Sequence, residues 1–312
     1  AKKFGTQPQR IELSSESLGE CFYDFIEAID QPSGDGLNSF FVAYAASKKV
    51  KVAFSGLGAD ELFLGYNYMR EFERMIRFCG EHSVPEILEK FGRSNFGKKV
   101  LYKLGLSFAQ WQRGGYEAVY KGYRSLRSPK EVKEMFGKIP PKDFGVKKFF
   151  ENHDPMNALS MAELAFYASP MLLRDTDAAS MFHTLEVRVP FFDSELIKAV
   201  LSIPGRFKGN GKKLFVDAAR DFIPEEVIGR PKKGFEMPVA PWVFEELWDE
   251  LGEMEQIGWI SKKGVTDSMI PAFDNYEYLP MWSIMVLQQW IKHLNIELSY
   301  EKMQTNFIRP SR

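Results

Sequence analysis

A short strand pattern followed by a glycine-rich turn and an acidic helix start most constrains the fold of this chain. Val50 to Phe54 is short, β-branched and apolar enough for a strand that is buried on both faces. The stretch SGLGADELF, Ser55 to Phe63, follows directly. Because glycines permit a tight turn and a close backbone approach, this junction favours an anion at the start of the next helix. Packing is the alternative explanation, since strand-Gly-x-Gly-helix turns also occur in α/β proteins for packing reasons.

The two acidic residues of this junction suggest a metal ion. Asp60 and Glu61 stand at the helix start, where a carboxylate could hold a divalent cation that bridges phosphates. The junction therefore predicts nucleotide chemistry.

Three further segments accompany the junction. They are DQPSGDGLNSFF (30–41), LLRDTDAASM (172–181) leading into LEVRVPFFD (185–193), and RPKKGF (230–235). In this order the four motifs resemble the synthetase domain of the glutamine-hydrolysing asparagine synthetases, from about Gly5 to the region of Trp242. The resemblance implies an α/β fold, with a truncated parallel sheet of the adenine-nucleotide alpha-hydrolase (ATP-pyrophosphatase) type and a largely helical C-terminal part.

The resemblance also implies an ATP-dependent amide-forming reaction. A substrate carboxylate attacks the α-phosphate of ATP to give an acyl-adenylate and pyrophosphate, and ammonia then attacks the acyl carbon. Such chemistry needs Mg²⁺ and fixed positive charges more than a protein nucleophile. The implied catalytic residues are Asp60, as a magnesium ligand beside Glu61, and Lys232, as the cation on the phosphates. The implied nucleotide contacts are Ser55, Gly56, Leu57 and Gly58.

Four charged residues are candidates for binding the carboxylate substrate. They are Arg174, Asp177, Glu186 and Arg188. A structural ion-pair network beside the sheet is the alternative, because arginine–carboxylate pairs serve both purposes. For Lys232, the alternative interpretation is that it belongs to a solvated basic turn. The resemblance favours Lys232 over Lys233, because Lys232 aligns with the lysine of the family.

Two parts of the family pattern are absent from these residues. The sequence contains no Ser-Gly-Gly-x-Asp-Ser loop for pyrophosphate, and neither cysteine stands where a glutaminase nucleophile would. We therefore expect a partner chain or a preceding region to supply the loop and the ammonia. The alternative is a non-catalytic or split-site subunit that binds a partner through the exposed edge of its sheet, where a homodimer could also form.

Leu57 departs from the asparagine-forming members of the family, which usually carry glutamate between the two glycines. A carboxylate there could orient or deprotonate the incoming amine, and leucine can do neither. Leu57 and the Asp35-Gly36-Leu37-Asn38 variant look more like relatives encoded with surface-polysaccharide pathways. Asparagine biosynthesis is therefore one expectation, and amidation of another carboxylate is the other.

The chain should divide into a nucleotide-binding remnant, 1–66, and a mainly helical remainder, 67–312, packed as one unit. We expect a helix end before Gly5, a strand over Gln9–Leu13 and a surface loop from Pro140 to Lys148. The expected helices cover Ser14 or Ser15 to Ala28, Asn38–Ser47, Tyr68–Gly80, Val84–Phe91, Gly97–Arg113, Gly115–Tyr123 and Pro155–Ala168.

Composition excludes several classes of protein. A net charge of −1 gives no electrostatic attraction for nucleic acid or an anionic membrane. No apolar run approaches the ~20 residues that span a bilayer. The two cysteines, far apart, argue against a disulfide scaffold and fit a cytoplasmic protein. The four histidines have no metal-ligand spacing, so a zinc or iron site is not expected.

Overall fold

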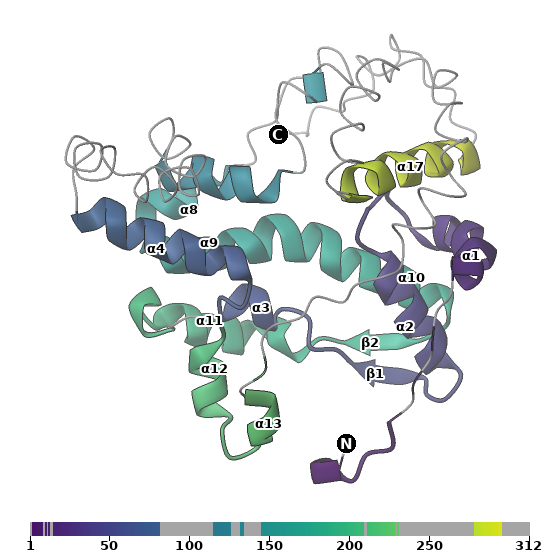
Figure 1. The fold of residues 1–312 in the computed structure, drawn as a ribbon, viewed down its shortest axis with the longest axis horizontal. Coiled ribbons are helices and arrows are strands. Elements are labelled where there is room, and N and C mark those ends of the chain that lie inside the picture. The colour runs from purple at the N-terminus through teal and green to yellow at the C-terminus, as the bar shows by residue number, and fades with distance from the viewer. Residues whose placement is uncertain are drawn as a thin grey trace, which may run out of the picture.

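The computed structural model describes residues 2–8, 10, 12, 15–81, 115–125, 132–133, 145–208, 211–228, 230 and 278–294. These residues are predominantly helical, with one small parallel sheet (Figure 1). The N-terminal half contains η1 (Lys2–Phe4), α1 (Ser15–Ala28), α2 (Leu37–Ser47), β1 (Val52–Phe54), α3 (Ala59–Leu62), α4 (Asn67–Glu81) and a helix over 115–124. Then follow α8 (Lys147–Asn152), α9 (Pro155–Glu163), η2 (Leu164–Leu173), α10 (Arg174–Phe182), β2 (Glu186–Arg188), η3 (Pro190–Phe192), α11 (Ser194–Ser202), η4 (Gly205–Phe207), α12 (Lys213–Ala218), α13 (Glu225–Ile228) and α17 (Tyr278–His293).

The sheet consists of two parallel strands, β1 and β2. Val52 pairs with Glu186, and Phe54 pairs with Arg188. Helices α2 and α10 pack against each other, and α10 contacts β2, so both helices lie on one side of the strands (Figure 1). The central residues Ala53 and Val187 are half-buried, whereas the residues beside them are exposed. Because side chains alternate between the faces of a strand, one face of the sheet is covered and the other is exposed.

The expectation that β1 is buried on both faces is wrong for the described residues. The strand is in place, but Val52 is 40% exposed and Phe54 is 75% exposed. The physical reason is that the described helices cover one face only. Apolar β-branched residues predicted the strand correctly, but they could not tell which face would be covered.

A continuous helical rod, formed by α9, η2 and α10, crosses the molecule (Figure 1). Its start is well defined, because the Asp154 carboxylate accepts hydrogen bonds from the backbone N–H groups of Met156 and Asn157. The predicted end at Ala168 is wrong. Pro170 lies inside η2, whose wider π-helical turns accommodate a residue that would break an α-helix.

The hydrophobic core has two parts that matter for the site. One joins α4, the 115–124 helix and α9 around Met69, Phe72 and Leu159. The other lies beneath α3, where Leu62 and Phe63 pack with residues of η3, α11 and α12. At the far end, Trp282 of α17 packs on the α1 rings of Phe22 and Phe25.

Other predictions had mixed outcomes. The helices expected at Asn38–Ser47, Tyr68–Gly80 and Gly115–Tyr123 are confirmed within a residue or two, as is the helix that ends at Ala28. The positive φ of Gly5 confirms the helix stop there. The loop expected up to Lys148 is wrong at its end, because α8 begins at Lys147.

Some predictions stay open. The helices expected at 84–91 and 97–113 lie outside the described residues. Of the strand expected at 9–13, only residues 10 and 12 are described, and neither is in a strand. The division at residue 66 stays a prediction.

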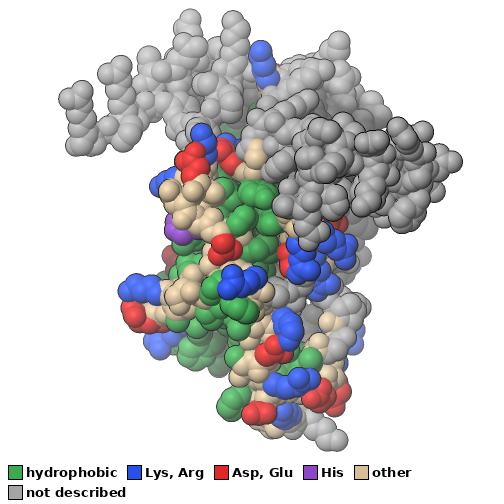
Figure 2. Space-filling model, turned by 90° about the vertical axis from the view of Figure 1, so that its left-hand side faces the viewer, with side chains coloured by type: hydrophobic (Ala, Val, Ile, Leu, Met, Phe, Trp, Pro, Cys, Tyr) green, Lys and Arg blue, Asp and Glu red, His purple; other side chains and the backbone are tan. Residues whose placement is uncertain are grey.

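The described surface carries mixed charge. In Figure 2, basic and acidic side chains alternate around a central band of hydrophobic side chains on this face. No described helix is long and apolar enough to cross a membrane.

Candidate functional site

The junction after β1 has the tight geometry that its sequence predicts. The Ser55 N–H donates to the Arg188 carbonyl at 2.8 Å, which extends the sheet by one bond. The Ser55 hydroxyl then accepts a hydrogen bond from the Leu57 N–H at 3.3 Å, so the chain turns immediately. Helix α3 begins after Gly58, and the carboxyl end of β1 therefore meets the amino end of α3. In parallel sheets, ligands bind at this edge.

The two glycines of the junction have different roles. Gly58 has a φ of 92°, and a Cβ atom there would lie 2.6 Å from the Phe192 ring. Packing alone therefore requires glycine at this position, as the alternative interpretation proposed. At Gly56, by contrast, a Cβ atom would meet no heavy atom of the described residues within 4 Å. Within the described part of the chain, the backbone at Gly56 therefore borders open space, which a ligand could occupy.

Asp60 lies in the first turn of α3 and forms an ion pair that the sequence analysis missed. Its Oδ1 atom is 3.0 Å from Nζ of Lys212, and both side chains are partly buried. Lys212 precedes α12 and has a left-handed backbone with a φ of 64°. Such a conformation is uncommon in a residue other than glycine and requires support from its surroundings. The glycines of the GNGK sequence that ends at Lys212 were the only local signal of this turn.

Glu61 differs from Asp60 in its environment. It is 2% exposed, and its carboxylate accepts a hydrogen bond from the Tyr66 hydroxyl. Burial raises the pKa of Tyr66, and the Glu61 carboxylate raises it further, so the hydroxyl remains a donor. Asp60 is therefore the better placed of the two carboxylates for an incoming cation.

A buried cluster of arginine and tyrosines adjoins the junction and was also missed. The Arg124 guanidinium binds the fully buried Glu163 carboxylate, with an Nε–Oε1 distance of 2.7 Å. It also lies 3.6 Å from the centroid of the Tyr167 ring and stacks near Tyr66. The Tyr167 hydroxyl donates to Asp35 at 2.7 Å. This cluster links the Glu61 side of the junction to the loop before α2.

The four candidate substrate residues are not brought together in one group. Arg174 pairs with Asp30 at 2.9 Å, and Arg188 pairs with Glu186 at 2.8 Å. All four of these side chains are about half exposed, and Asp177 is exposed as well. Glu186 and Arg188 lie two residues apart on the exposed face of β2, where neighbouring side chains of one strand meet. The pair between Glu186 and Arg188 is one that the ion-pair alternative expects, whereas Arg174 pairs with a residue outside the four. Both the network and substrate contact stay predictions.

Comparison with known proteins decides the family. A family model described as asparagine synthase matches residues 1–292. The chain belongs to the asparagine synthase family. Asparagine synthetase [glutamine-hydrolyzing] 1 of Bacillus subtilis is 28% identical over 91% of this chain and 46% of its own length.

Two more distant relatives extend the asparagine synthase comparison. A protein of Mycobacterium bovis, named provisionally as a glutamine-hydrolysing asparagine synthetase, is 27% identical over 78% of this chain and 38% of its own length. Amidase chry2 of Gibberella zeae is 22% identical over 92% of this chain and 48% of its own length. The chain thus spans less than half of each of these relatives. No solved structure matches it significantly.

The residues of this asparagine synthase family member fit one type of magnesium site. No described group of three or more His, Cys, Asp or Glu side chains could hold a metal ion by itself. Magnesium usually binds through one or two carboxylates together with substrate phosphates, which is what Asp60 beside an open backbone can provide. Lys232 lies outside the described residues, so its role stays a prediction.

The asparagine synthase motif around Asp175 contains a titrating carboxyl group. Burial raises the pKa of Asp175 to about 6, although Ser33 and Gln31 donate hydrogen bonds to it. At this carboxyl group the folded protein therefore binds more protons than the unfolded chain between about pH 4 and 6. The contribution of Asp175 to stability should therefore fall as the pH rises through this window.

We expect the Asp175→Asn variant to lack this dependence. Its unfolding free energy, relative to the wild type, should rise between pH 4 and 6 and then stay constant. Urea denaturation at several pH values measures this, and Asp177→Asn, on the exposed side of α10, is the control. Parallel pH profiles of the wild type and Asp175→Asn would contradict the prediction.

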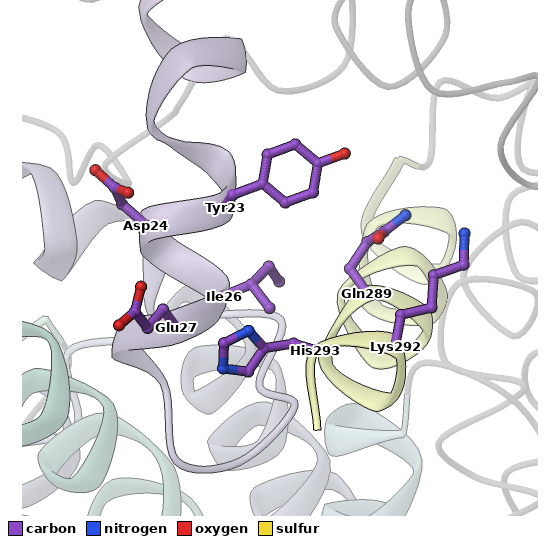
Figure 3. A pocket seen from close by; sticks show the side chains of 7 residues that line it. All are labelled: Tyr23, Asp24, Ile26, Glu27, Gln289, Lys292 and His293. Atoms are coloured by element: carbon purple, nitrogen blue, oxygen red, sulfur yellow. The ribbon is translucent and has the colours of Figure 1, made fainter. Parts of the chain in front are cut away.

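A groove of about 490 Å³ lies elsewhere, between α1 and α17 (Figure 3). Acidic Asp24 and Glu27 come from α1, whereas Lys292 and His293 come from the end of α17. In Figure 1 these helices lie at the right of the molecule, whereas α3 lies near its centre, and no residue of the junction lines the groove. The groove is therefore separate from the candidate nucleotide junction of this asparagine synthase family member.

Proposed function

We propose that this chain is the synthetase portion of an ATP-dependent amide-forming enzyme with the adenine-nucleotide alpha-hydrolase fold. The observation that carries the proposal is the junction after β1, where no described atom approaches the open side of Gly56 and Asp60 lies in the first turn of the next helix. Family membership and the relatives named as asparagine synthetases support the same reaction class.

In the proposed reaction, a carboxylate substrate displaces pyrophosphate from ATP to form an acyl-adenylate, and ammonia then displaces AMP and loses a proton to give the amide. Ser55, Gly56, Leu57 and Gly58 border the phosphates, and Asp60 holds magnesium. When bound, the metal ion would neutralise charge on the phosphate oxygens. Lys232 would add a fixed positive charge, and Lys212, which already lies 3.0 Å from Asp60, would supply another.

The cofactor assignment can be tested by calorimetric titration of the chain with ATP, with and without Mg²⁺. Magnesium-dependent binding is the expected result, because Asp60 alone is a weak metal ligand until phosphate oxygens complete the coordination. Magnesium-independent binding would contradict the role of Asp60. Absence of binding at millimolar ATP would favour the split-site alternative described below.

Lys232→Ala tests the proposed phosphate cation. We expect it to slow adenylate formation by roughly 10²-fold or more while ATP binding weakens less, because charge on the transferring phosphorus is greatest in the transition state. Pyrophosphate exchange measures the first quantity and calorimetry the second. Lys233→Ala, one residue away, is the matched control. Unchanged adenylate formation in Lys232→Ala would favour the solvated basic turn, and equal loss in both lysine variants would show that the effect is not specific to Lys232.

Leu57→Glu tests the identity of the acceptor. A glutamate between the two glycines could orient or deprotonate the incoming amine, an effect typically worth about 10²–10⁴ in rate. If the natural product is not asparagine, this variant should gain aspartate-dependent formation of asparagine, detected by amino-acid analysis. Leu57→Gln is the control, because glutamine has the shape of glutamate but lacks its basic carboxylate. Equal activity in both variants would exclude general-base assistance.

A specific observation favours the second candidate function, a split-site subunit that needs a partner. The exposed face of the sheet carries Val52 and Phe54, and Phe54 is among the most exposed large hydrophobic residues. A segment that carries the pyrophosphate loop, from a partner chain or a preceding region, could add a strand at the edge of this sheet and place a helix on the exposed face. Co-expression with a glutaminase and loop segment should then restore magnesium-dependent ATP binding. A homodimer would instead bury the same face without restoring ATP binding.

A further inference from the structure

A buried lysine beneath the junction has no role in the proposed reaction. The side chain of Lys208 is completely buried, although it carries an ammonium group. Within the described part of the chain, its one side-chain hydrogen bond is a long one of 3.4 Å to the Ser160 hydroxyl. Burial lowers the pKa of Lys208 to about 8, and the Asp154 carboxylate opposes this shift. A buried charge with so little pairing costs stability, and a methionine of similar length would avoid that cost.

The hydrogen bond of Lys208 continues to the candidate site. Ser160 is also completely buried, and its hydroxyl donates to the Leu62 carbonyl at 3.2 Å. Leu62 is the last residue of α3, the four-residue helix that carries Asp60 and Glu61. The ammonium therefore polarises Ser160 toward the carbonyl at the end of α3. The same segment of chain also reaches the start of α3, through the ion pair between Lys212 and Asp60.

The elements that carry Lys208 and Ser160 are held together by hydrogen bonds. Asp154 caps α9, which carries Ser160, and it also accepts a hydrogen bond from the Gly205 N–H of η4 at 3.2 Å. A Cβ atom at Gly205 would lie 2.2 Å from the Asp154 carboxylate, so this close approach requires glycine. Asn157 adds two hydrogen bonds from α9 to the chain that leads into η4. Lys208 and Ser160 thus approach α3 from two elements that are locked together.

We propose that Lys208 is a positioning residue, which acts through Ser160 and the Leu62 carbonyl to hold α3, and with it Asp60, in place. The role of Asp60 in this inference rests on the proposed function. The mechanical part of the inference, that Lys208 and Ser160 hold α3 in place, does not rest on the proposed function. It concerns only the hydrogen bonds and the stability of α3.

Hydrogen exchange in the 312-residue chain tests the mechanical part. Lys208→Met and Ser160→Ala should each speed amide exchange around 62–65 by roughly two- to tenfold, the range for loss of one hydrogen bond. Lys208→Met should not lower the thermal unfolding temperature, because it removes a buried charge at similar volume. Lys213→Met, in an exposed pair with Asp217, is the matched control. If Lys208→Met failed to fold, Ser160→Ala would still test the contact without removing a charge.

Two results would overturn the proposal. Unchanged exchange around 62–65 in both variants would show that the contact does not hold α3. If amide exchange instead rose equally in α3, α9 and α11, and the thermal unfolding temperature fell with it, Lys208 would be an ordinary core residue without a specific effect on α3. A further measurement separates this inference from the proposed function. If the wild type binds ATP with Mg²⁺, Lys208→Met should weaken that binding severalfold. If the wild type does not bind, the split-site alternative is favoured, and the exchange result still decides the role of Lys208.

Discussion

Asp60→Asn is expected to lower magnesium-dependent pyrophosphate exchange by at least about 10²-fold, because one fixed group that acts on developing charge typically contributes this much. The exchange assay is made on the chain together with the segment that carries the pyrophosphate loop. Asparagine keeps the shape of the side chain but loses the negative charge that magnesium prefers. The variant should also leave Lys212 without its ionic partner, 3.0 Å away.

The controls separate metal binding from folding. Asp217→Asn removes an acidic residue of the nearby helix α12, where the exposed pair with Lys213 contributes little. Its exchange activity should equal that of the wild type. If Asp60→Asn kept its activity and its dependence on Mg²⁺, Asp60 would not be the magnesium ligand. If it lost thermal stability in proportion to activity, the ion pair with Lys212 would be structural only.

Arg124→Met is expected to have the largest effect on stability. Removal of the guanidinium leaves the Glu163 carboxylate buried without its partner, and such losses typically cost about 3–5 kcal/mol of unfolding free energy. The stacking of Arg124 on Tyr167 is lost as well. Urea denaturation, with the two-state assumption checked by two probes, measures the change.

The double variant Arg124→Met with Glu163→Met shows whether the pair or its packing matters. Because both charges are then absent, we expect the double variant to be more stable than Arg124→Met alone. Arg77→Met removes a cation from the exposed pair with Glu73 on α4 and should change stability by less than about 1 kcal/mol. Additive losses in the double variant would show that the two side chains are not coupled.

Local patterns predicted the junction well. The apolar run before Ser55 became β1, and the glycine before Ala59 took up the positive φ that only glycine adopts easily. The helical periodicity of α4, which extends over several turns, likewise predicted that helix. These features depend on residues close together in the chain, which a sequence shows directly.

Long-range contacts could not be predicted in this way. Arg124 and Glu163, or Asp60 and Lys212, are far apart in sequence, and charged residues of this kind are common on any surface. The packing of the 115–124 helix on α9 selects the first pair, and the approach of the chain before α12 to α3 selects the second. The exposed face of β1 and the passage of the helix through Pro170 likewise depend on neighbours in space. The family motifs indicated where the site lies, but not which side chains support it.

The pairing of β1 with β2 has a consequence for how the chain folds. Val52 and Glu186 are neighbours in the sheet, yet α3, α4, the 115–124 helix and the rod from α9 to α10 all lie between them in sequence. Closing so long a loop costs entropy before the strand contacts can offset it. The helices should therefore form first and bring the two strands together late. The candidate nucleotide junction, which depends on that pairing, would then be among the last parts of the molecule to form.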